Sequence, residues 1–320
     1  MYMWLAYAFF SAILLGCYDV FKKQALRGNP VIPVLFLNTL FCSLIFAVPL
    51  LLSYFHSLPA DHLLYVPPIT WFSQKYILLK SCIVLSSWML GYYGMKHLPL
   101  TIVGPINATR PVMVLLGALI LFGERLNVYQ WMGVSLAILS FFLLSRSGKK
   151  EGIDFKHDRW IFCVVGAAML GAISGLYDKY LMAMPESGGV GLNRMEVQCY
   201  YNFYQCAMMG LIFLYHALVK HSESSFLSIG QKLRPTSATL HFVWSIPLIS
   251  LFLSAADFAY FYSLSLDGAM VSIVSMVRRS SVIVSFLLAA ILFSEKNLSS
   301  KAFDLLLVLL GMVFLWLGSR

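Results

Sequence analysis

Two adjacent arginines, Arg278 and Arg279, lie inside a run from Ala269 to Phe293 that carries no other charge and is mostly apolar. A run of that length predicts a transmembrane helix. Arg278 comes nine residues after Ala269, which is about 14 Å along a helix that rises roughly 1.5 Å per residue. This depth is near the middle of a hydrocarbon core about 30 Å thick, where inserting each arginine costs about 2.5–3.5 kcal/mol. The pair must therefore face protein, water or an anionic ligand rather than lipid.

Two interpretations of the arginine pair remain open. One is an internal salt bridge, for which Asp19, Asp178 and Asp257 are the acidic partners within apolar stretches. Intramembrane charges often pair with one another in this way. The other is direct contact with an anionic substrate. Neighbouring residues on a helix point about 100° apart, so one arginine can brace a helix while the other faces a cavity, and both interpretations can hold together.

The composition of the whole chain is that of a membrane protein. Of its 320 residues, 60% are hydrophobic and only 12% are charged, and the mean hydropathy is +0.79. These values are typical of a polytopic helical membrane protein and exclude an ordinary soluble domain. The net charge of +9 therefore bears on membrane topology and anionic partners. Nucleic acid is not an expected partner, since no basic nucleic-acid motif stands outside the apolar runs.

Ten apolar runs are long enough to predict membrane-spanning helices. They cover residues 2–21, 32–54, 75–95, 101–122, 128–145, 159–182, 197–219, 240–264, 269–293 and 302–318. The polar loop 145–158 divides them into two sets of five, so we expect two repeats, residues 1–148 and 149–320. The predicted fold class is an all-α membrane protein with ten transmembrane helices.

The two halves share four short sequence matches, in the same order along each half. The matched segments are 16–19 (GCYD) with 175–178 (GLYD), Asn38 with Asn202, 101–104 (TIVG) with 272–275 (SIVS), and 121–125 (LFGER) with 292–296 (LFSEK). Because five spans are an odd number, the second copy enters the membrane from the opposite side. Inverted repeats of this kind are typical of alternating-access transporters.

The five-plus-five repeat and its two endings, LFGER and LFSEK, resemble the drug/metabolite transporter superfamily and its EamA-type ten-helix carriers over nearly the whole chain. The ninth span, SIVSMVRRSSVIVS, is similar to the basic-pair helix of the plastid phosphate-translocator branch. The segment 200–203 (YYNF) is similar to the Y-N-N motif of nucleotide-sugar carriers, with Phe203 in place of the second asparagine. The resemblance implies inverted repeats that place the fourth and ninth spans together at a central substrate cavity.

Three deep arginines are the main candidates for substrate binding. Arg110, in the fourth span, comes nine residues after Thr101, a depth similar to that of Arg278 and Arg279. Three guanidinium groups at a central cavity would suit a phosphate or carboxylate, because the planar fork binds such oxygens bidentately. Five neutral residues complete the candidate set as hydrogen-bonding groups along the cavity: Asn38, Asn107, Asn202, Tyr92 and Tyr260.

Three acids within the spans are candidates for coupling or gating. Asp19 and Asp178 are related by the repeat and lie near the ends of the first and sixth spans. They form either a gate or proton-coupling pair, or they are helix-end residues beside lysines near the headgroups. Asp257 lies in the middle of its span and is expected to pair with an arginine or to carry a proton. Lys80 either snorkels to the interface or extends the basic site.

We expect a secondary active transporter that moves a small anionic metabolite, such as an organic phosphate or a nucleotide-like compound. The alternative is an exporter of amino acids or other small zwitterions. The sequence contains no P-loop, nucleophile elbow, metal-ligand cluster or dinucleotide motif, so we expect neither an enzyme nor a cofactor or metal. The expected partners are a small-molecule substrate, the lipid bilayer, and a coupled proton or counter-solute.

The lack of a targeting segment favours a bacterial inner membrane. Lysines and arginines are concentrated at the loops that follow odd-numbered spans. By the positive-inside rule this bias places both termini outside, whereas the family resemblance implies a cytoplasmic N-terminus. The orientation therefore stays open between these two alternatives.

Overall fold

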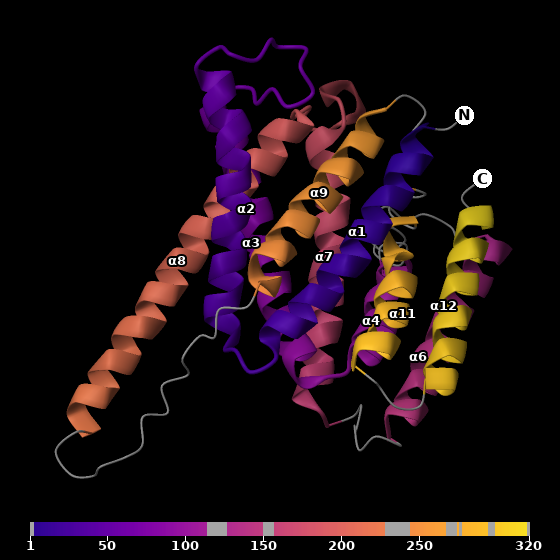
Figure 1. The fold of residues 1–320 in the computed structure, drawn as a ribbon. Coiled ribbons are helices and arrows are strands. Elements are labelled where there is room, and N and C mark those ends of the chain that lie inside the picture. The colour runs from indigo at the N-terminus through magenta and orange to yellow at the C-terminus, as the bar shows by residue number, and fades with distance from the viewer. Residues whose placement is uncertain are drawn as a thin grey trace.

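We describe the chain from a computed structural model that covers residues 3–113, 127–149, 157–227, 244–266, 274, 277–293 and 298–318. Over these ranges the regular structure is helical, without a strand (Figure 1). The elements are α1 (Met3–Leu26), α2 (Val31–Tyr54), α3 (Trp71–His97), α4 (Leu100–Ala108), α6 (Val128–Lys149), α7 (Arg159–Met182), the 3₁₀ turn η1 (Pro185–Ser187), α8 (Arg194–Leu227), α9 (Ser245–Ser265), α11 (Ser281–Phe293) and α12 (Leu298–Gly318). Within the described residues, α1, α2, α3, α7 and α9 are long and apolar enough to cross a membrane. The prediction of an all-α membrane protein is confirmed.

Each of the ten predicted spans overlaps one of these helices. The largest difference is at α8, which has 34 residues and extends past both predicted limits, residues 197 and 219. Its last turns are polar and so gave no hydrophobic signal, and Figure 1 shows this end projecting from the bundle. The repeat endings at 121–125 and 294–296 lie outside the described residues.

A short turn joins α1 to α2. Gly28 adopts a left-handed backbone with φ +81°, a conformation that glycine takes at little cost. The Asn29 side chain donates a 2.9 Å hydrogen bond to the Ala25 carbonyl and so satisfies one free carbonyl at the end of α1. Pro30 then precedes the first residue of α2, where its missing N–H does no harm. The turn returns the chain across the bundle in the opposite direction.

Most helix contacts join the first half of the chain to the second. Helix α1 packs on α9 and α7 packs on α3, while α2 packs on α8, α4 on α11 and α6 on α12. When each helix is replaced by its equivalent in the other half, the pair α1–α9 becomes the pair α7–α3. Each of the other three pairs becomes itself. In Figure 1 both chain termini lie at one end of the bundle, α2 runs towards that end, and α8 runs away from it. This arrangement agrees with inverted repeats, although the division at residue 148 stays a prediction.

The outward faces of the helices remain apolar. On α1, Phe9 and Phe10 expose 51% and 54% of their surface, whereas Ala8 and Ala12 on the other face are buried. On α2, Leu44 is exposed while Leu35 is fully buried. Large apolar side chains gathered on a surface in this way mark contact with membrane or protein. The bundle therefore presents lipid-facing surfaces around a packed interior.

Candidate functional site

The two helices that carry the arginines are both interrupted beside them. Helix α4 ends at Ala108, Thr109 forms a turn, and the chain is helical again over 110–113. In the second half, residues 277–279 are helical, and Ser280 forms a turn before α11 begins. Helices α4 and α11 pack against each other, so both interruptions lie along one helix pair.

The interruptions occur at equivalent positions of the predicted repeat, since Thr109 corresponds to Ser280. The Thr109 hydroxyl donates to the Ile106 carbonyl at 2.7 Å, and the Ser280 hydroxyl donates to the Val277 carbonyl at 2.6 Å. Each hydroxyl thus takes a carbonyl of the preceding turn and competes with regular helical bonding. Discontinuous helices of this kind form substrate and ion sites in many transporters with inverted repeats.

Arg110 is held by its own helix and lies against α7. Its Nη2 donates to the Asn107 Oδ1 at 2.9 Å. A Cβ atom at Gly171 of α7 would lie 2.6 Å from the Arg110 Nη1, so the guanidinium packs directly against the Gly171 backbone. The Arg110 Nε is buried without a partner. Asn107 therefore positions Arg110, and the guanidinium keeps free donors.

Arg278 is neutralised by an acid of a neighbouring helix. It forms an ion pair with Asp257 of α9, and the Tyr201 hydroxyl of α8 donates to the other carboxylate oxygen at 2.7 Å. The Arg278 guanidinium carbon also lies 4.2 Å from the centre of the Tyr260 ring, a cation–π contact. Of the two interpretations of the arginine pair, Arg278 follows the internal salt bridge, and Tyr260 supports it.

Arg279 differs from its neighbour. No hydrogen bond or ion pair joins it to any residue in the described part of the chain. It lies within electrostatic range of two other guanidiniums, those of Arg110 and Arg278, and of the Asp19 carboxylate. Arg110 likewise has no ion pair within the described ranges. The structure thus brings together two arginines, one from each half, whose charges are not matched by a contacting carboxylate.

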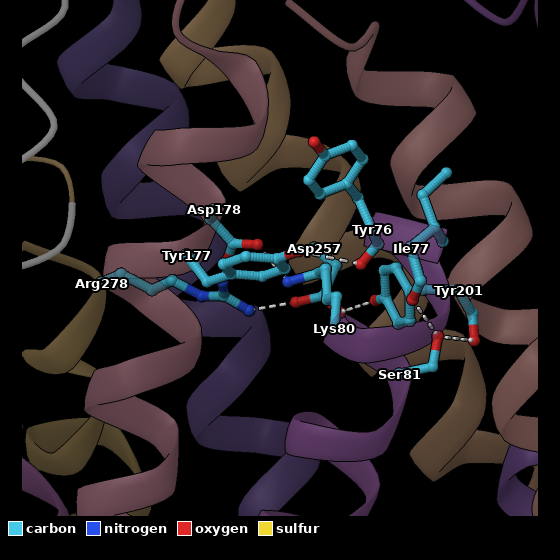
Figure 2. A network of polar contacts seen from close by, with 9 residues as sticks. All are labelled: Tyr76, Ile77, Lys80, Ser81, Tyr177, Asp178, Tyr201, Asp257 and Arg278. Atoms are coloured by element: carbon cyan, nitrogen blue, oxygen red, sulfur yellow. Dashed lines mark hydrogen bonds and ion pairs between the residues drawn. The ribbon is translucent and has the colours of Figure 1, made fainter. Parts of the chain in front are cut away.

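A second buried ion pair joins α3 to α7. Lys80 contacts the Asp178 carboxylate, and both residues are buried. The Lys80 ammonium also lies 5.4 Å from the centre of the Tyr201 ring, so Tyr201 adjoins both ion pairs (Figure 2). Lys80 does not snorkel, and Asp178 is not a helix-end residue exposed near the headgroups. Both side chains are buried because α3 begins early, at Trp71, so that Lys80 lies well inside the bundle.

Removing one partner of this pair is expected to destabilise the protein strongly. Lys80→Met leaves the Asp178 carboxylate buried without its cation, which costs about 3–5 kcal/mol when a buried pair is broken from one side. The double variant Lys80→Met/Asp178→Asn leaves no charge behind and is expected to recover most of that loss. Thermal unfolding of the wild type and the two variants in one detergent measures both effects. A double variant as unstable as Lys80→Met would contradict an ion-pair origin.

Asp19 has a different environment from its repeat partner Asp178. Its carboxylate accepts a 2.8 Å hydrogen bond from Lys22, three residues further along the same helix. The Lys22 ammonium also lies 4.2 Å from the Tyr18 ring centre and 5.3 Å from that of Tyr92. Each of the two acids thus has its own lysine, and they do not pair with each other. Tyr92 contributes to the site through its ring.

The repeat-related asparagines contact helices rather than arginines. The Asn38 Oδ1 accepts a 3.0 Å hydrogen bond from Ser250 of α9, and its Nδ2 is buried without a partner. The Asn202 side chain donates to the Gln198 carbonyl at 2.7 Å, and Ser43 of α2 donates to the Asn202 carbonyl at 3.0 Å. These contacts tie α2, α8 and α9 together. Nothing in the described residues joins either asparagine to the arginine cluster.

Two residues of the network, Lys80 and Tyr201, lie outside the main candidate set of the sequence analysis, in which Lys80 was an alternative extension of the basic site. A signal for Lys80 was present, because it is the only charged residue between Tyr76 and Met95 of the third span. A single charge in such a run needs a buried partner or a ligand. The signal for Tyr201 was weaker: it lies in the segment 200–203 that resembles the Y-N-N motif, but aromatic residues make up 15% of the chain. Its role follows only from the packing of α8 against α3 and α9.

Comparison with known proteins supports a transport function for this architecture. A model of the EamA-like transporter family matches residues 2–146. Among solved structures, 28 chains match. One of them, described only as a crystal structure of a protein, superposes with a TM-score of 0.58 at 13% sequence identity, covering 99% of this chain and 98% of its own. That likeness concerns the fold and extends over both halves. No curated protein matches the sequence.

Proposed function

Because this chain is a member of the drug/metabolite transporter superfamily with an EamA-like first half, we propose that it carries a small anion across the membrane by alternating access. An organic phosphate or a nucleotide-like compound is the substrate class we favour. The observation that carries the proposal is the pair Arg110 and Arg279. They come from different halves of the chain, interact electrostatically, and have no ion pair within the described residues.

The charge of the whole cluster supports an anionic ligand. The basic members are Lys22, Lys80, Arg110, Arg278 and Arg279, and the acidic members are Asp19, Asp178 and Asp257. Among the described residues the cluster thus carries five positive and three negative groups, an excess of two positive charges. Buried charges of one sign are costly unless they are paired. An anion bound between Arg110 and Arg279 would remove this cost, and the planar fork suits phosphate oxygens.

Alternating access is supported by a difference between repeat-equivalent interfaces. Gly16 of α1 lies in tight contact with α11. Its equivalent, Gly175 of α7, has open space in the direction of its neighbours, since no atom of the described residues lies within 4 Å of a Cβ built there. Two copies of one structural unit in different arrangements are what a carrier needs in order to expose its site to each side in turn.

The remaining parts of the proposal extend the membrane assignment. The chain is an integral multi-pass membrane protein and belongs to a family of transporters rather than enzymes. We place it in a bacterial inner membrane, built from repeats 1–148 and 149–320. The acids Asp19, Asp178 and Asp257 are our candidates for gating or for coupling to a proton or counter-solute.

Export of amino acids or other zwitterions is the second candidate function. The observation that favours it is the pair Asp257 and Arg278, which places a carboxylate and a guanidinium in contact within the cluster. A zwitterion offers the complementary charges, an ammonium for Asp257 and a carboxylate for Arg278. Binding would then open this ion pair rather than fill the space between Arg110 and Arg279.

A thermal-shift screen of the purified protein distinguishes the two candidates. We expect phosphate monoesters and inorganic phosphate to raise the unfolding temperature, because a ligand at 100 times its Kd stabilises the state it binds by about 2.7 kcal/mol. Dicarboxylates, nucleotide sugars and amino acids complete the panel. Stabilisation by amino acids alone would overturn the anion proposal and assign the protein to zwitterion export.

A further inference from the structure

The carboxylate of Asp257 has both oxygens occupied in the described structure. Arg278 contacts its Oδ1, and the Tyr201 hydroxyl donates to its Oδ2 at 2.7 Å. The residue is only 8% exposed. Over the described ranges, Arg278 is the one cation in contact with this carboxylate. The charge of Asp257 therefore depends on where Arg278 points.

The groups around Asp257 would not replace Arg278 if it moved. Helix α8 contributes the neutral Tyr201, α2 contributes the Cys42 thiol, and α7 contributes Asp178, which is itself negative. On α3, Lys80 already holds Asp178. On α1, the Ser11 hydroxyl donates to the backbone carbonyl of Ala256 and not to the carboxylate. Without Arg278, Asp257 would be a buried carboxylate with one hydrogen bond and an acidic neighbour.

Arg278 is also placed to serve a bound anion. It directly precedes Arg279, and it lies within electrostatic range of Arg110 and Arg279, the two arginines of the cluster that form no ion pair with a described residue. Its Nε is buried and has no partner. A guanidinium presents donors along two edges, so an anion held by Arg110 and Arg279 competes with Asp257 for Arg278.

We propose that the substrate anion takes Arg278 from Asp257, and that Asp257 then binds a proton, so that one proton travels with each anion. This step rests on the anion site proposed above. The proton comes from water on the side to which the site is open and bonds to the Oδ1 that Arg278 released, while Tyr201 continues to donate to Oδ2. A buried carboxylate without a partner is neutralised in this way because its desolvation is so costly. When the anion leaves, Arg278 returns to Asp257 and the proton departs to the other side.

The proton step predicts a specific pH dependence of binding. Because binding takes up a proton at Asp257, the affinity rises as pH falls, by about tenfold per pH unit for one linked proton. We would measure the affinity of the full-length protein for inorganic phosphate between about pH 5.5 and 8.5. The titration of phosphate itself is common to every variant, so the comparison rests on the difference between variants.

Asp257→Asn is expected to lose the part of the pH dependence of phosphate affinity that comes from the Asp257 proton, since asparagine takes up no proton. It should also bind phosphate more tightly than the wild type at the high end of the range, because Arg278 is free from the start. Asp304→Asn is the matched control: it removes another buried carboxylate, located in α12, and is expected to keep the wild-type pH dependence.

Tyr201→Phe is a second variant, which retains the ion pair between Asp257 and Arg278. It is expected to keep the one-proton dependence but to shift it to higher pH, because the donor that stabilises the charged carboxylate is gone.

The outcomes separate this inference from the function on which it rests. Wild type and Asp257→Asn with the same pH dependence would overturn the proton step and leave the anion site standing. A wild type that binds neither inorganic phosphate nor a phosphate monoester at any pH would overturn the anion site and the proton step together. If Asp257→Asn does not fold, the same decision rests on Tyr201→Phe, whose unshifted dependence would contradict the proposal.

Discussion

Replacement of Arg279 by glutamine is expected to weaken phosphate binding by about 10- to 150-fold while leaving the fold intact. The range corresponds to the loss of a hydrogen bond to a charged group, about 1.5–3 kcal/mol. Folding should not suffer, because Arg279 has no hydrogen bond or ion pair to lose within the described residues. Its removal also relieves repulsion with Arg110 and Arg278. Isothermal titration of the purified variants with inorganic phosphate measures the affinity, and thermal unfolding without ligand measures the stability.

The neighbouring arginine provides the matched control. Arg278→Gln leaves Asp257 buried without its cation, so we expect a loss of about 3–5 kcal/mol in stability, which Arg279→Gln should not show. Arg110→Gln is expected to behave like Arg279→Gln. The opposite pattern, with Arg279→Gln strongly destabilised and phosphate affinity unchanged, would make Arg279 a structural residue and remove the main support for the anion site.

Much of the fold follows from the sequence because a membrane span leaves a strong one-dimensional signal. A helix that crosses a hydrocarbon core needs about 20 apolar residues, and each of the ten predicted runs overlaps a described helix. The signal fails where a helix continues into water. Helix α8 runs to Leu227 through polar turns that hydropathy does not detect.

The partners of the deep charges could not be predicted from the sequence. Adjacent arginines point about 100° apart, which shows that Arg278 and Arg279 differ but not which of them meets an acid. That choice depends on how the helical segment 277–279 lies against α9, a property of packing. The interruption at Ser280 was also invisible, because a hydroxyl that bonds its own helix can either keep or break the next turn. The interruption at Thr109 had a sequence signal, because Pro111 lacks the N–H that would bond the Asn107 carbonyl and so bends or breaks the helix there.

The depth of Asp178 in the bundle also could not be predicted from the sequence. Its position near the end of the sixth span, beside Lys179, suggested a headgroup contact. In the structure it is buried against Lys80. Depth counted along one helix ignores the neighbours that cover its end, and here α3 starts early enough to cover α7. Contact between distant segments decides the environment of a charge near a span end.

Transport by this chain should be blocked by filling the open interface at Gly175. No atom in the described residues lies within 4 Å of a Cβ built there. This is so although Arg110 and Met113, the repeat equivalents of the residues that Gly16 contacts in α11, are both described. Gly175→Leu therefore places its Cβ where no described atom lies within 4 Å. It would clash with α4 once α7 closes on that helix, and overpacking of this kind costs about 1–3 kcal/mol. We expect Gly175→Leu to retain phosphate binding and to lose about 5- to 150-fold in phosphate exchange across liposomes, since each 1.4 kcal/mol added to the closing step is a tenfold loss.

The equivalent change at Gly16 is expected to act in the opposite direction. A Cβ there would lie 2.5 Å from the Val284 Cβ and 2.9 Å from the backbone carbonyl oxygen of Ser281. Neither atom can move away alone, because one belongs to a stiff β-branched side chain and the other to the backbone. Even Gly16→Ala must separate α1 from α11 and so disfavour the described state, whereas Gly175→Ala should be neutral. Accessibility of cysteines placed at Met113 and Val284, in a background without the native cysteines, reports the shift from each side. Equal effects of the two alanine variants on that accessibility would mean that the two interfaces do not alternate, and the carrier would then need a different closing motion.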